Sequence, residues 1–237
     1  MSLPTGDAGF ELVDIDEDLL VLNKPAGLLC VPGRGADKQD CLSARVQSLY
    51  PEALVVHRLD MATSGLVLMA RHPAAQRMLG QAFASRAAIK HYEALVQGHL
   101  HAPGGDTDWS LIDAPIAADW PRRPLRIIDA QGQPSQTLWR VLAHTHWQGM
   151  PCTHLQLQPL TGRTHQLRVH LQSLGHPIVG DALYHPPSTA PRLMLHACSL
   201  RLPHPSKGTV CEWHSPSPLR SIARLVDLDH TTQPTAL

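Results

Sequence analysis

The sequence predicts an α+β fold, because segments with strand periodicity outnumber helical ones and several follow one another directly. The first such pair covers residues 10–15 and 19–23 and is separated by acidic residues typical of a turn. Three other stretches, at 41–49, 74–87 and 163–174, carry apolar residues at helical spacing. We therefore expect a β-sheet with flanking helices.

Size and composition limit the class of protein. The chain has 237 residues and 43% hydrophobic content, enough for a real core. We expect a short N-terminal segment over 1–9, one domain of two sub-lobes sharing a sheet over 10–226, and a disordered tail over 227–237. No apolar run approaches the roughly 20 residues of a membrane span. The start has neither a basic region nor an apolar signal core, so a cytoplasmic protein with no membrane contact is expected.

Cysteine spacing and charge narrow the class further. The five cysteines are odd in number and form no C-x-x-C pair, which disfavours a disulfide framework or a zinc knuckle. The formal net charge is zero, but the first 20 residues hold six acidic side chains and no lysine or arginine. The remainder carries 20 basic and 14 acidic side chains, and most of the basic ones are arginines, which suit phosphate recognition. This composition permits a nucleic-acid partner without requiring one.

The turn after the first hairpin has the sequence Lys24-Pro25-Ala26-Gly27-Leu28. Proline and glycine force a turn at this point. A simple end to the strand and a wall that shapes a cleft both fit the pattern. Residues 31–40 are Gly-rich and charged and are predicted to be a loop, and the helix over 41–49 follows.

The most informative stretch is His57-Arg58-Leu59-Asp60-Met61-Ala62-Thr63-Ser64-Gly65. It is predicted to be a polar loop between a strand at 55–56 and a strongly apolar strand at 66–70. A polar loop braced by strands is a common place for chemistry. Asp60 is the candidate catalytic carboxylate, although spacing alone favours an aspartate that only caps a turn.

A helix and a strand follow this loop. Pro73 is placed for a first helical turn, and the helix continues over 74–87. The residues expected to face inward are Met78, Leu79, Ala82 and Phe83. The strand over 89–98 alternates so that Lys90 and Tyr92 point to one side. Periodicity alone favours a Tyr92 that is buried in the core.

Residues 99–107 form a polar connection to a short strand at 112–116. The next loop, Asp119-Trp120-Pro121-Arg122-Arg123-Pro124, presents an aromatic ring among arginines and stiffens it with prolines. Such a loop can bind nucleic acid through stacking and phosphate pairing. A buried tryptophan with solvated arginines is the alternative.

The C-terminal half is predicted to contain strands at 135–144, 153–159, 193–202 and 209–213, and a last helix at 216–226. Between them, residues 160–171 lead into a helix that runs to Leu174. Gly162 permits the turn, Arg163 stands at the N-terminal end of the inward face with Leu167, and Gly175 ends the helix.

These stretches resemble the motifs of the RluA family of pseudouridine synthases. HRLDMATSG, NKPAGL, the K-x-Y strand and LTGRTHQLRVHL all match, and the resemblance covers roughly residues 10–215. It implies the pseudouridine synthase fold, a mixed and mostly antiparallel sheet with a central catalytic cleft. The D-W-P-x-R-P loop resembles the branch that modifies both 23S rRNA and tRNA. Gln133 departs from the lysine that close relatives usually carry.

The resemblance implies a reaction and residue roles. Uridine in RNA becomes pseudouridine when the N-glycosidic bond breaks, the uracil turns, and C5 bonds to C1′. Asp60 is the nucleophile or base, and Arg163 is our candidate for the positive charge that keeps it ionised. Tyr92 stacks on the uracil and is a candidate to move the C5 proton, while Leu167 packs on the base.

The target uridine must leave its stack, and Arg58 is placed to fill the vacated space. A salt-bridged structural arginine is the alternative. The residues expected to contact RNA or uracil are Arg58, Leu167, Lys90, Trp120, Arg122 and Arg123. RNA is the expected partner of a monomeric enzyme.

Two other classes of function fit the motifs less well. A glycoside hydrolase normally uses two carboxylates, and the motifs offer one. A catalytically silent RNA-binding module would not need Asp60, Tyr92 and Arg163 together. No metal and no cofactor are expected, because H-E-x-x-H is absent and His165 and His170 are one residue too far apart for a same-face pair.

Overall fold

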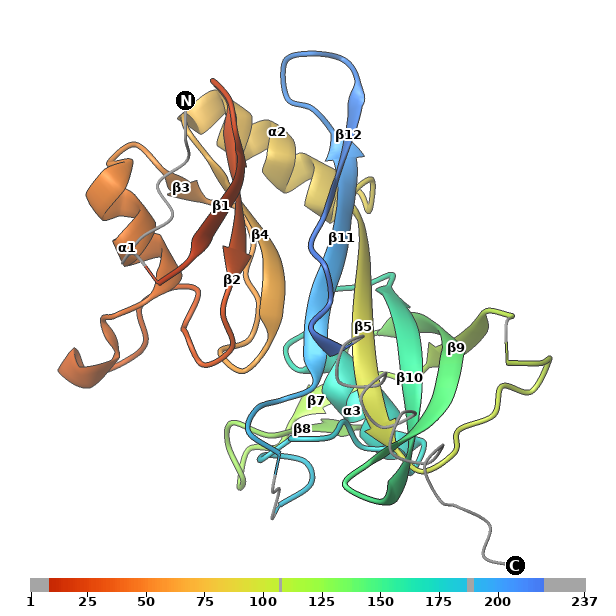
Figure 1. Cartoon of the computed structure of the whole chain (residues 1–237). Helices are drawn as coiled ribbons and strands as arrows, with labels where there is room; N and C mark the ends of the chain where they lie inside the picture. The colour runs from red at the N-terminus through yellow and green to blue at the C-terminus, as the bar shows by residue number, and fades with distance from the viewer. Residues whose placement is uncertain (1–8, 107, 187–189, 220–237) are drawn as a thin grey trace, which may run out of the picture. The chain divides into compact units, whose positions relative to one another are not determined.

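The computed structural model describes residues 9–106, 108–186 and 190–219, drawn in colour in Figure 1. The chain divides into two compact units. The first contains residues 1–90 and 197–215, and the second contains residues 91–196 and 216–237. The expected helix at 216–226 and the tail after it lie almost entirely outside the described residues.

The first unit is a sheet with two helices. Its elements are β1 (Glu11–Ile15), β2 (Leu19–Lys24), η1 (Ala36–Lys38), α1 (Leu42–Leu49), β3 (Leu54–Val55), β4 (Ser64–Ala70), α2 (Pro73–Ala84), most of β11 (Leu195–Pro203) and β12 (Val210–His214). The strand order is β1-β2-β4-β11, with β3 on β4 and β12 on β11. The pairs β1–β2, β2–β4 and β11–β12 are antiparallel, which confirms the predicted hairpin.

Helix α2 and the strands share the core of the first unit. Alternate residues of β2, β4 and β11 are buried together with two side chains of α2, as the period of two in a strand requires. The members on these elements are Leu19, Val21, Leu66, Leu68, Ala70, Ala75, Leu79, Leu200 and Leu202. Met78 was predicted to face inward and that prediction is wrong, since its side chain is 52% exposed. The buried stripe of α2 runs through Ala75, Leu79 and Ala82, and Met78 lies on its flank.

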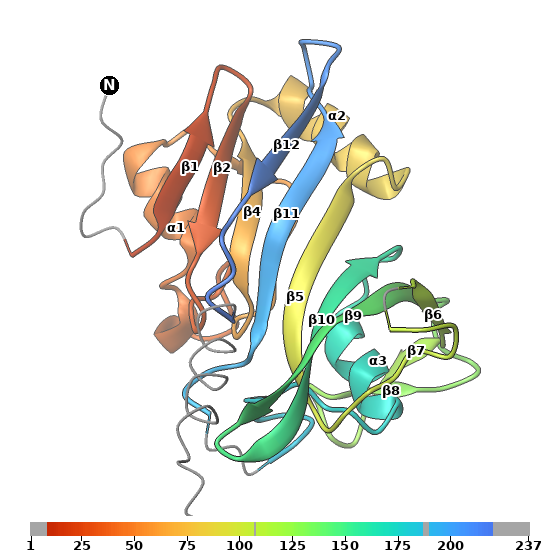
Figure 2. The same ribbon diagram turned by 45° about the vertical axis from the view of Figure 1, so that its right-hand side comes forward.

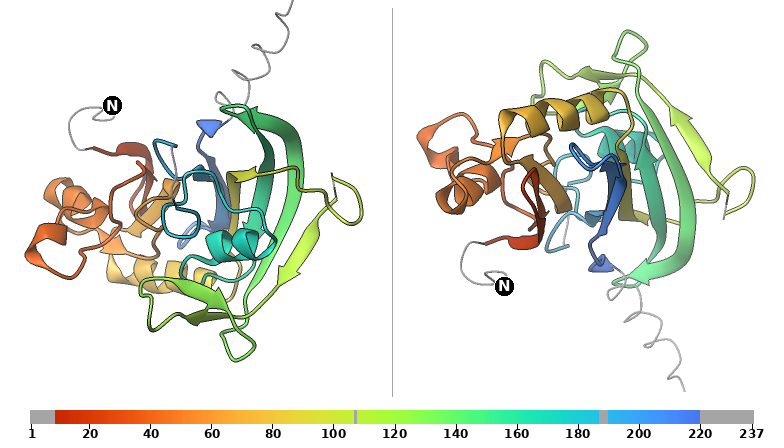
Figure 3. Two further views of the ribbon diagram at one scale, coloured as in Figure 1. Left: turned by 90° about the horizontal axis from the view of Figure 1, so that it is seen from below. Right: turned by 90° about the horizontal axis from the view of Figure 1, so that it is seen from above.

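The second unit is built on a long antiparallel hairpin, seen in Figure 2. Its elements are most of β5 (Ile89–Gln97), β6 (Ser110–Asp113), β7 (Ile116–Ala118), β8 (Arg126–Ile128), β9 (Gln136–Trp147), β10 (Met150–Pro159) and α3 (Gln166–Ser173). The order is β5-β10-β9-β6, and β7 and β8 form a separate pair. Figure 3 shows the strands β9 and β10 curving around α3.

Two predicted boundaries in the second unit are wrong. The single strand expected at 112–116 is two strands, because Pro115 has no N–H to donate and the chain passes from the partner β9 to the partner β8. The helix expected to open at Arg163 begins at Gln166, and His165 before it has a left-handed backbone with φ of 57°. Arg163 therefore lies in a turn. The helix ends before Gly175, as predicted, and Gly175 has a left-handed backbone with φ of 83°.

The α+β class is confirmed, and the predicted helices and strands are otherwise present within a few residues of their expected ends. Among the described residues, no helix has the length and apolar character needed to cross a membrane.

Candidate active site

Asp60 lies in the loop between β3 and β4, as the sequence predicted. The carbonyl oxygen of Asp60 accepts a 3.1 Å hydrogen bond from the N–H of Thr63, and Thr63 and Ser64 are both buried. Gly65 has φ of 112°, and a Cβ there would lie 2.3 Å from the carbonyl oxygen of Ala197. The glycine of the motif is therefore required by the close approach of the backbone at residue 197.

Lys24 is hydrogen-bonded to this loop. Its side chain is 1% exposed. Its ammonium group donates to the carbonyl oxygens of Pro25 at 2.8 Å, Leu28 at 2.7 Å and Met61 at 3.0 Å. The N–H of Gly27 also donates to the carbonyl oxygen of Met61, at 2.8 Å. The N-K-P-A-G-L turn is thus more than the end of a strand, because it fixes the residue that follows Asp60.

His57 and Cys30 make further hydrogen bonds at and beside this loop. His57 Nε2 accepts a 3.0 Å hydrogen bond from the N–H of Leu68, and its ring stacks on Phe83 with centroids 4.4 Å apart. Burial, with the nearby positive charge of Lys90, lowers the pKa of His57 to about 3. Cys30 Sγ accepts from the N–H of Leu59 at 3.1 Å, and burial raises the pKa of this thiol.

Two basic residues expected to contact RNA belong to the same unit. Arg58 is exposed, and it makes no hydrogen bond or ion pair with any residue that the structure describes. This exposure disfavours the alternative of a salt-bridged structural arginine. Lys90 is half-buried in β5, and burial lowers the pKa of its ammonium group.

Tyr92 and Leu167 belong to the second unit. Tyr92 lies in β5 opposite Leu157 of β10, and its side chain is 9% exposed. Leu167 lies in the first turn of α3 and is 7% exposed. Both are buried, as the predicted inward faces of the strand and the helix required.

Arg163 is positioned by the side chain of Gln166. Gln166 Oε1 accepts from the N–H of Arg163 at 3.0 Å and from Thr161 Oγ1 at 2.7 Å. Gln166 Nε2 donates to the carbonyl oxygen of Gln136 at 2.8 Å and to Thr137 Oγ1 at 3.0 Å. The exposed guanidinium of Arg163 donates to the carbonyl oxygen of Pro134 at 3.3 Å. A buried amide thus fixes the backbone of the turn that carries Arg163.

A second network supports the same turn. The hydroxyl of Tyr184 accepts from the N–H of Arg126 at 2.9 Å and lies 2.9 Å from His165 Nδ1. Asp181 accepts two hydrogen bonds from Arg168, of 2.8 and 2.7 Å, in an almost fully buried ion pair. Asp181 Oδ1 also accepts from the N–H of Tyr184 at 3.0 Å. No sequence pattern assigned a role to these residues, although Gln166 and Arg168 stand inside the LTGRTHQLRVHL motif.

A pocket of about 430 Å³ adjoins Arg163. It is lined by Ile116, Ala117, Ala118, Arg126, Gln131, Gly132, Gln133, Arg163 and Thr164. The Nε atom of Arg126 is buried and has no hydrogen-bond partner among the described residues. Two guanidinium groups and two side-chain amides suit a phosphate or the edge of a base. Gln133, the departure from the usual lysine, lies in this lining.

The loop from Asp119 to Pro124 displays its aromatic ring. Trp120 is 69% exposed, so the alternative of a buried tryptophan is wrong. The guanidinium of Arg123 lies 3.6 Å from the centroid of the Trp120 ring, and Arg122 pairs with the buried Asp119 at 2.7 Å. Trp120 and Arg123 together form an exposed stacking platform.

The predicted site residues are therefore divided between the units. Asp60, Arg58 and Lys90 belong to the first, and the second holds Tyr92, Arg163, Leu167, Trp120, Arg122 and Arg123. Two clusters in the described residues have ligand atoms suited to a metal ion, Asp16 with Asp18 and His204, and His101 with Asp106 and His144. Neither contains a predicted site residue.

The sequence model of the RNA pseudouridylate synthases matches residues 18–173 of the chain, which include Asp60, Tyr92 and Arg163. The chain belongs to the RNA pseudouridylate synthase family. The class of enzyme expected from the sequence, an isomerase that acts on RNA, is thereby confirmed.

Individual pseudouridylate synthases are similar over most of their length. The dual-specificity RNA pseudouridine synthase RluA of Vibrio vulnificus (strain CMCP6) is 44% identical over 208 residues, which cover 86% of this chain and 81% of that protein. The protein with the same description from Escherichia coli (strain K12) is 42% identical over 206 residues, covering 85% and 90%. The solved structure of human RNA Pseudouridylate Synthase Domain Containing 1 is similar with a TM-score of 0.74 and 32% identity, covering 91% and 87%.

Proposed function

We propose that this protein converts specific uridines to pseudouridine in two structured RNAs, a stem-loop of 23S rRNA and a tRNA anticodon stem-loop. The observation that carries the proposal is the Asp60 loop, around which Lys24, His57 and Cys30 each make a buried or part-buried hydrogen bond. A catalytic carboxylate has to be held rigidly, because small displacements of a reacting group lower the rate strongly. The dual-specificity description of the similar Vibrio and Escherichia proteins supports two substrates.

The residues divide the chemistry among them. Asp60 attacks the nucleotide or removes a proton from it, and the positive charge of Arg163 favours the ionised carboxylate. Tyr92 stacks on the uracil while Leu167 packs against the base. The glycosidic bond breaks, the base turns, C5 bonds to C1′, and the proton that leaves C5 is matched by one gained at N1. The product is an isomer of the substrate, so no oxidant or co-substrate is consumed.

Recognition of the RNA rests on exposed groups in the second unit. The platform of Trp120 and Arg123 suits an unstacked base, since stacking on an aromatic ring accepts any base. The pocket beside Arg163 suits a neighbouring phosphate or base edge. Reading a local loop by shape and splayed bases allows one enzyme to accept two RNAs that share that loop.

The test is turnover by Asp60→Asn, with Asp37→Asn as the matched control on an exposed turn of the same unit. RNA labelled with tritium at C5 of uridine releases tritium only when the C5 bond forms. We expect Asp60→Asn to bind RNA and melt like the wild type but release no tritium, while the control is fully active. Substantial release by Asp60→Asn would refute its assignment.

Wild-type outcomes separate the other functions. Release of free uracil would indicate a hydrolase, and RNA binding without either product would indicate a silent binding module. Full activity on the 23S stem-loop with none on any tRNA anticodon stem-loop would refute the second substrate.

A further inference from the structure

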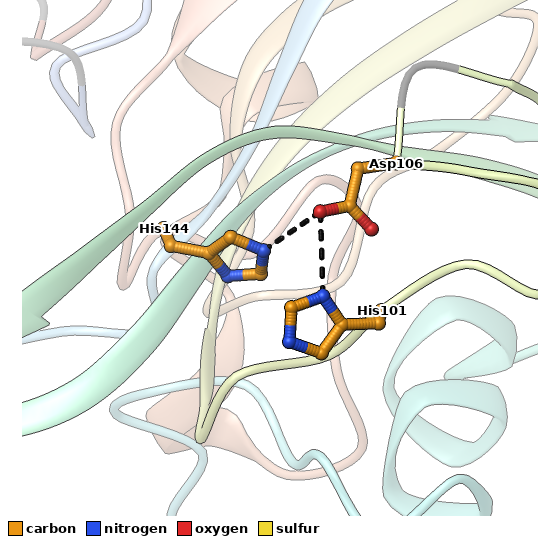
Figure 4. A group of neighbouring side chains, drawn as sticks. All are labelled: His101, Asp106 and His144. Atoms are coloured by element: carbon orange, nitrogen blue, oxygen red, sulfur yellow. Dashed lines mark hydrogen bonds and ion pairs between the residues drawn. The ribbon is translucent and has the colours of Figure 1, made fainter.

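A cluster of two histidines and one aspartate lies in the second unit and includes none of the predicted site residues. His101 and Asp106 stand on the connection between β5 and β6, and His144 stands in β9 (Figure 4). Asp106 Oδ2 lies 2.9 Å from His144 Nε2 and 3.4 Å from His101 Nδ1. Three potential ligand atoms therefore converge, all within 4.8 Å of one another.

The separations match the coordination geometry of a transition metal. In a tetrahedral zinc site with bonds of about 2.0–2.2 Å, two ligand atoms lie about 3.3 Å apart. The two contacts of Asp106 Oδ2 bracket that value. Only small side-chain movements would therefore be needed to place one ion against all three atoms.

The second nitrogen of His144 is already fixed by a hydrogen bond. The single hydroxyl proton of Thr153 is donated to the carbonyl oxygen of Gly98 at 2.7 Å, and Thr153 Oγ1 accepts from the N–H of Leu100 at 2.9 Å. Toward His144 Nδ1, 3.3 Å away, Thr153 can then only accept. Thr153 is therefore placed to accept from an N–H at Nδ1, and in the tautomer with that N–H, Nε2 presents its lone pair toward Asp106.

The convergence of these atoms suits a bound cation. His144 Nε2 lies 2.9 Å from Asp106 Oδ2, so a metal ion beside the pair can accept a lone pair from each atom. Metal-bound histidines usually donate their other ring N–H to a neighbouring group in this way. Among the described residues, no lysine or arginine pairs with Asp106.

In the second cluster, the carboxylates already have partners from the protein itself. In the cluster of Asp16, Asp18 and His204, the ammonium of Lys207 lies 2.6 Å from Asp16 Oδ2. Asp18 accepts a hydrogen bond from Ser206. A metal ion there would have to displace the ammonium group of the protein's own chain, so we assign it no metal.

The aspartate is also held in place. Asp106 Oδ1 accepts from the N–H of Ala102 at 3.1 Å, and the carbonyl oxygen of Asp106 accepts from the N–H of Val141 at 2.9 Å. These bonds orient Oδ2 toward the two rings before any ion binds. A preorganised ligand loses less conformational entropy on binding.

We propose that His101, Asp106 and His144 bind one divalent transition-metal ion of the zinc type. Two imidazoles and one carboxylate favour zinc, nickel or copper, whereas magnesium and calcium require oxygen ligands. The ion links the connection between β5 and β6 to β9. The fourth coordination position of the ion stays open to water. The site is independent of the proposed RNA chemistry.

The test uses full-length protein without a histidine tag, titrated with Co²⁺ as a spectroscopic probe and with Zn²⁺ by calorimetry. We expect one site, a tetrahedral Co²⁺ absorption that Zn²⁺ abolishes, and a higher melting temperature with Zn²⁺. His144→Ala and Asp106→Ala should each weaken binding at least ten-fold. Mg²⁺ should not compete.

The matched control is His214→Ala, because His214 also lies near a carboxylate, at 3.5 Å from Glu212, but no third ligand joins them among the described residues. It should bind both ions like the wild type. Should His144→Ala itself unfold, His144→Gln and Asp106→Asn serve in its place with melting curves checked first. No binding at all, or binding that survives changes at both His144 and Asp106, would overturn the site and leave a protonated His144 as the explanation for the short contact.

Discussion

The ammonium group of Lys24 donates a 3.0 Å hydrogen bond to the carbonyl oxygen of Met61, the residue directly after Asp60. Two motifs separated by more than 30 residues in the chain are joined by this one contact. The lysine is almost completely buried and also binds two carbonyl oxygens of its own turn. The Lys24 side chain therefore fixes the position of the Asp60 loop.

Replacing Lys24 by methionine should weaken both fold and activity. The change keeps the apolar stem but removes the lysine donor from the carbonyl oxygens of Pro25 and Leu28, while that of Met61 keeps the N–H of Gly27. A buried acceptor without a partner costs about 1–3 kcal/mol. We expect the free energy of unfolding to fall by roughly 2–4 kcal/mol, with kcat reduced more than KM is raised. Urea unfolding and steady-state tritium release measure the two effects. Lys38→Met, on an exposed turn, is the control, and equal behaviour of the two variants would contradict the role.

Stability should depend on pH through His57. Its pKa is lowered to about 3 in the folded protein, against about 6.5 when unfolded, so unfolding takes up a proton anywhere between these values. The stabilisation it provides is complete above pH 6.5 and is lost as pH falls, by up to about 1.4 kcal/mol per unit. Protonation also removes the lone pair that accepts from Leu68.

Urea unfolding at pH 7, 6 and 5 checks this dependence. His57→Gln, which has no titrating ring, should be less stable than the wild type at pH 7 and should lose less stability on acidification. Parallel stability curves for the two proteins would show that His57 does not titrate in this way.

Arg58 should assist the flipping of the target base out of a structured RNA. Its side chain is exposed and makes no hydrogen bond or ion pair within the described chain, so Arg58→Ala should leave the melting temperature nearly unchanged. Turnover should fall on a structured stem-loop, where the base must be flipped at a cost of a few kcal/mol, and recover on a flexible strand. Arg34→Ala, an exposed arginine outside the motif, should match the wild type on both RNAs. Equal loss on both substrates would count against a flipping role.

Trp120 should contribute to binding rather than to chemistry. It is largely exposed and stacked by Arg123, and stacking of one base on an aromatic side chain is worth about 1–3 kcal/mol. Trp120→Ala should raise KM by roughly ten-fold or more with little change in stability, while Trp120→Phe keeps most of the affinity. Fluorescence or filter-binding titrations with the stem-loop measure the affinity directly. A fall in kcat at unchanged affinity would place Trp120 in another role.

The sequence by itself determined the family, the candidate carboxylate and the type of most elements. Periodicities of two and 3.6 residues are local, so they identified β5 and α2 without any knowledge of the fold. HRLDMATSG likewise placed Asp60 on a loop between strands, because the turn residues and the apolar run are adjacent in the chain.

Tertiary structure decided the features that depend on residues far apart. The helix after Arg163 starts three residues later than its spacing suggested, because the buried Gln166 binds Gln136 and Thr137 and fixes a turn there. The contacts of Lys24 with Met61 and of His144 with Asp106 form only after folding brings segments remote in sequence together. Hydrogen bonds of this kind form where folding removes water from polar groups, and no local pattern records which partner will be brought near.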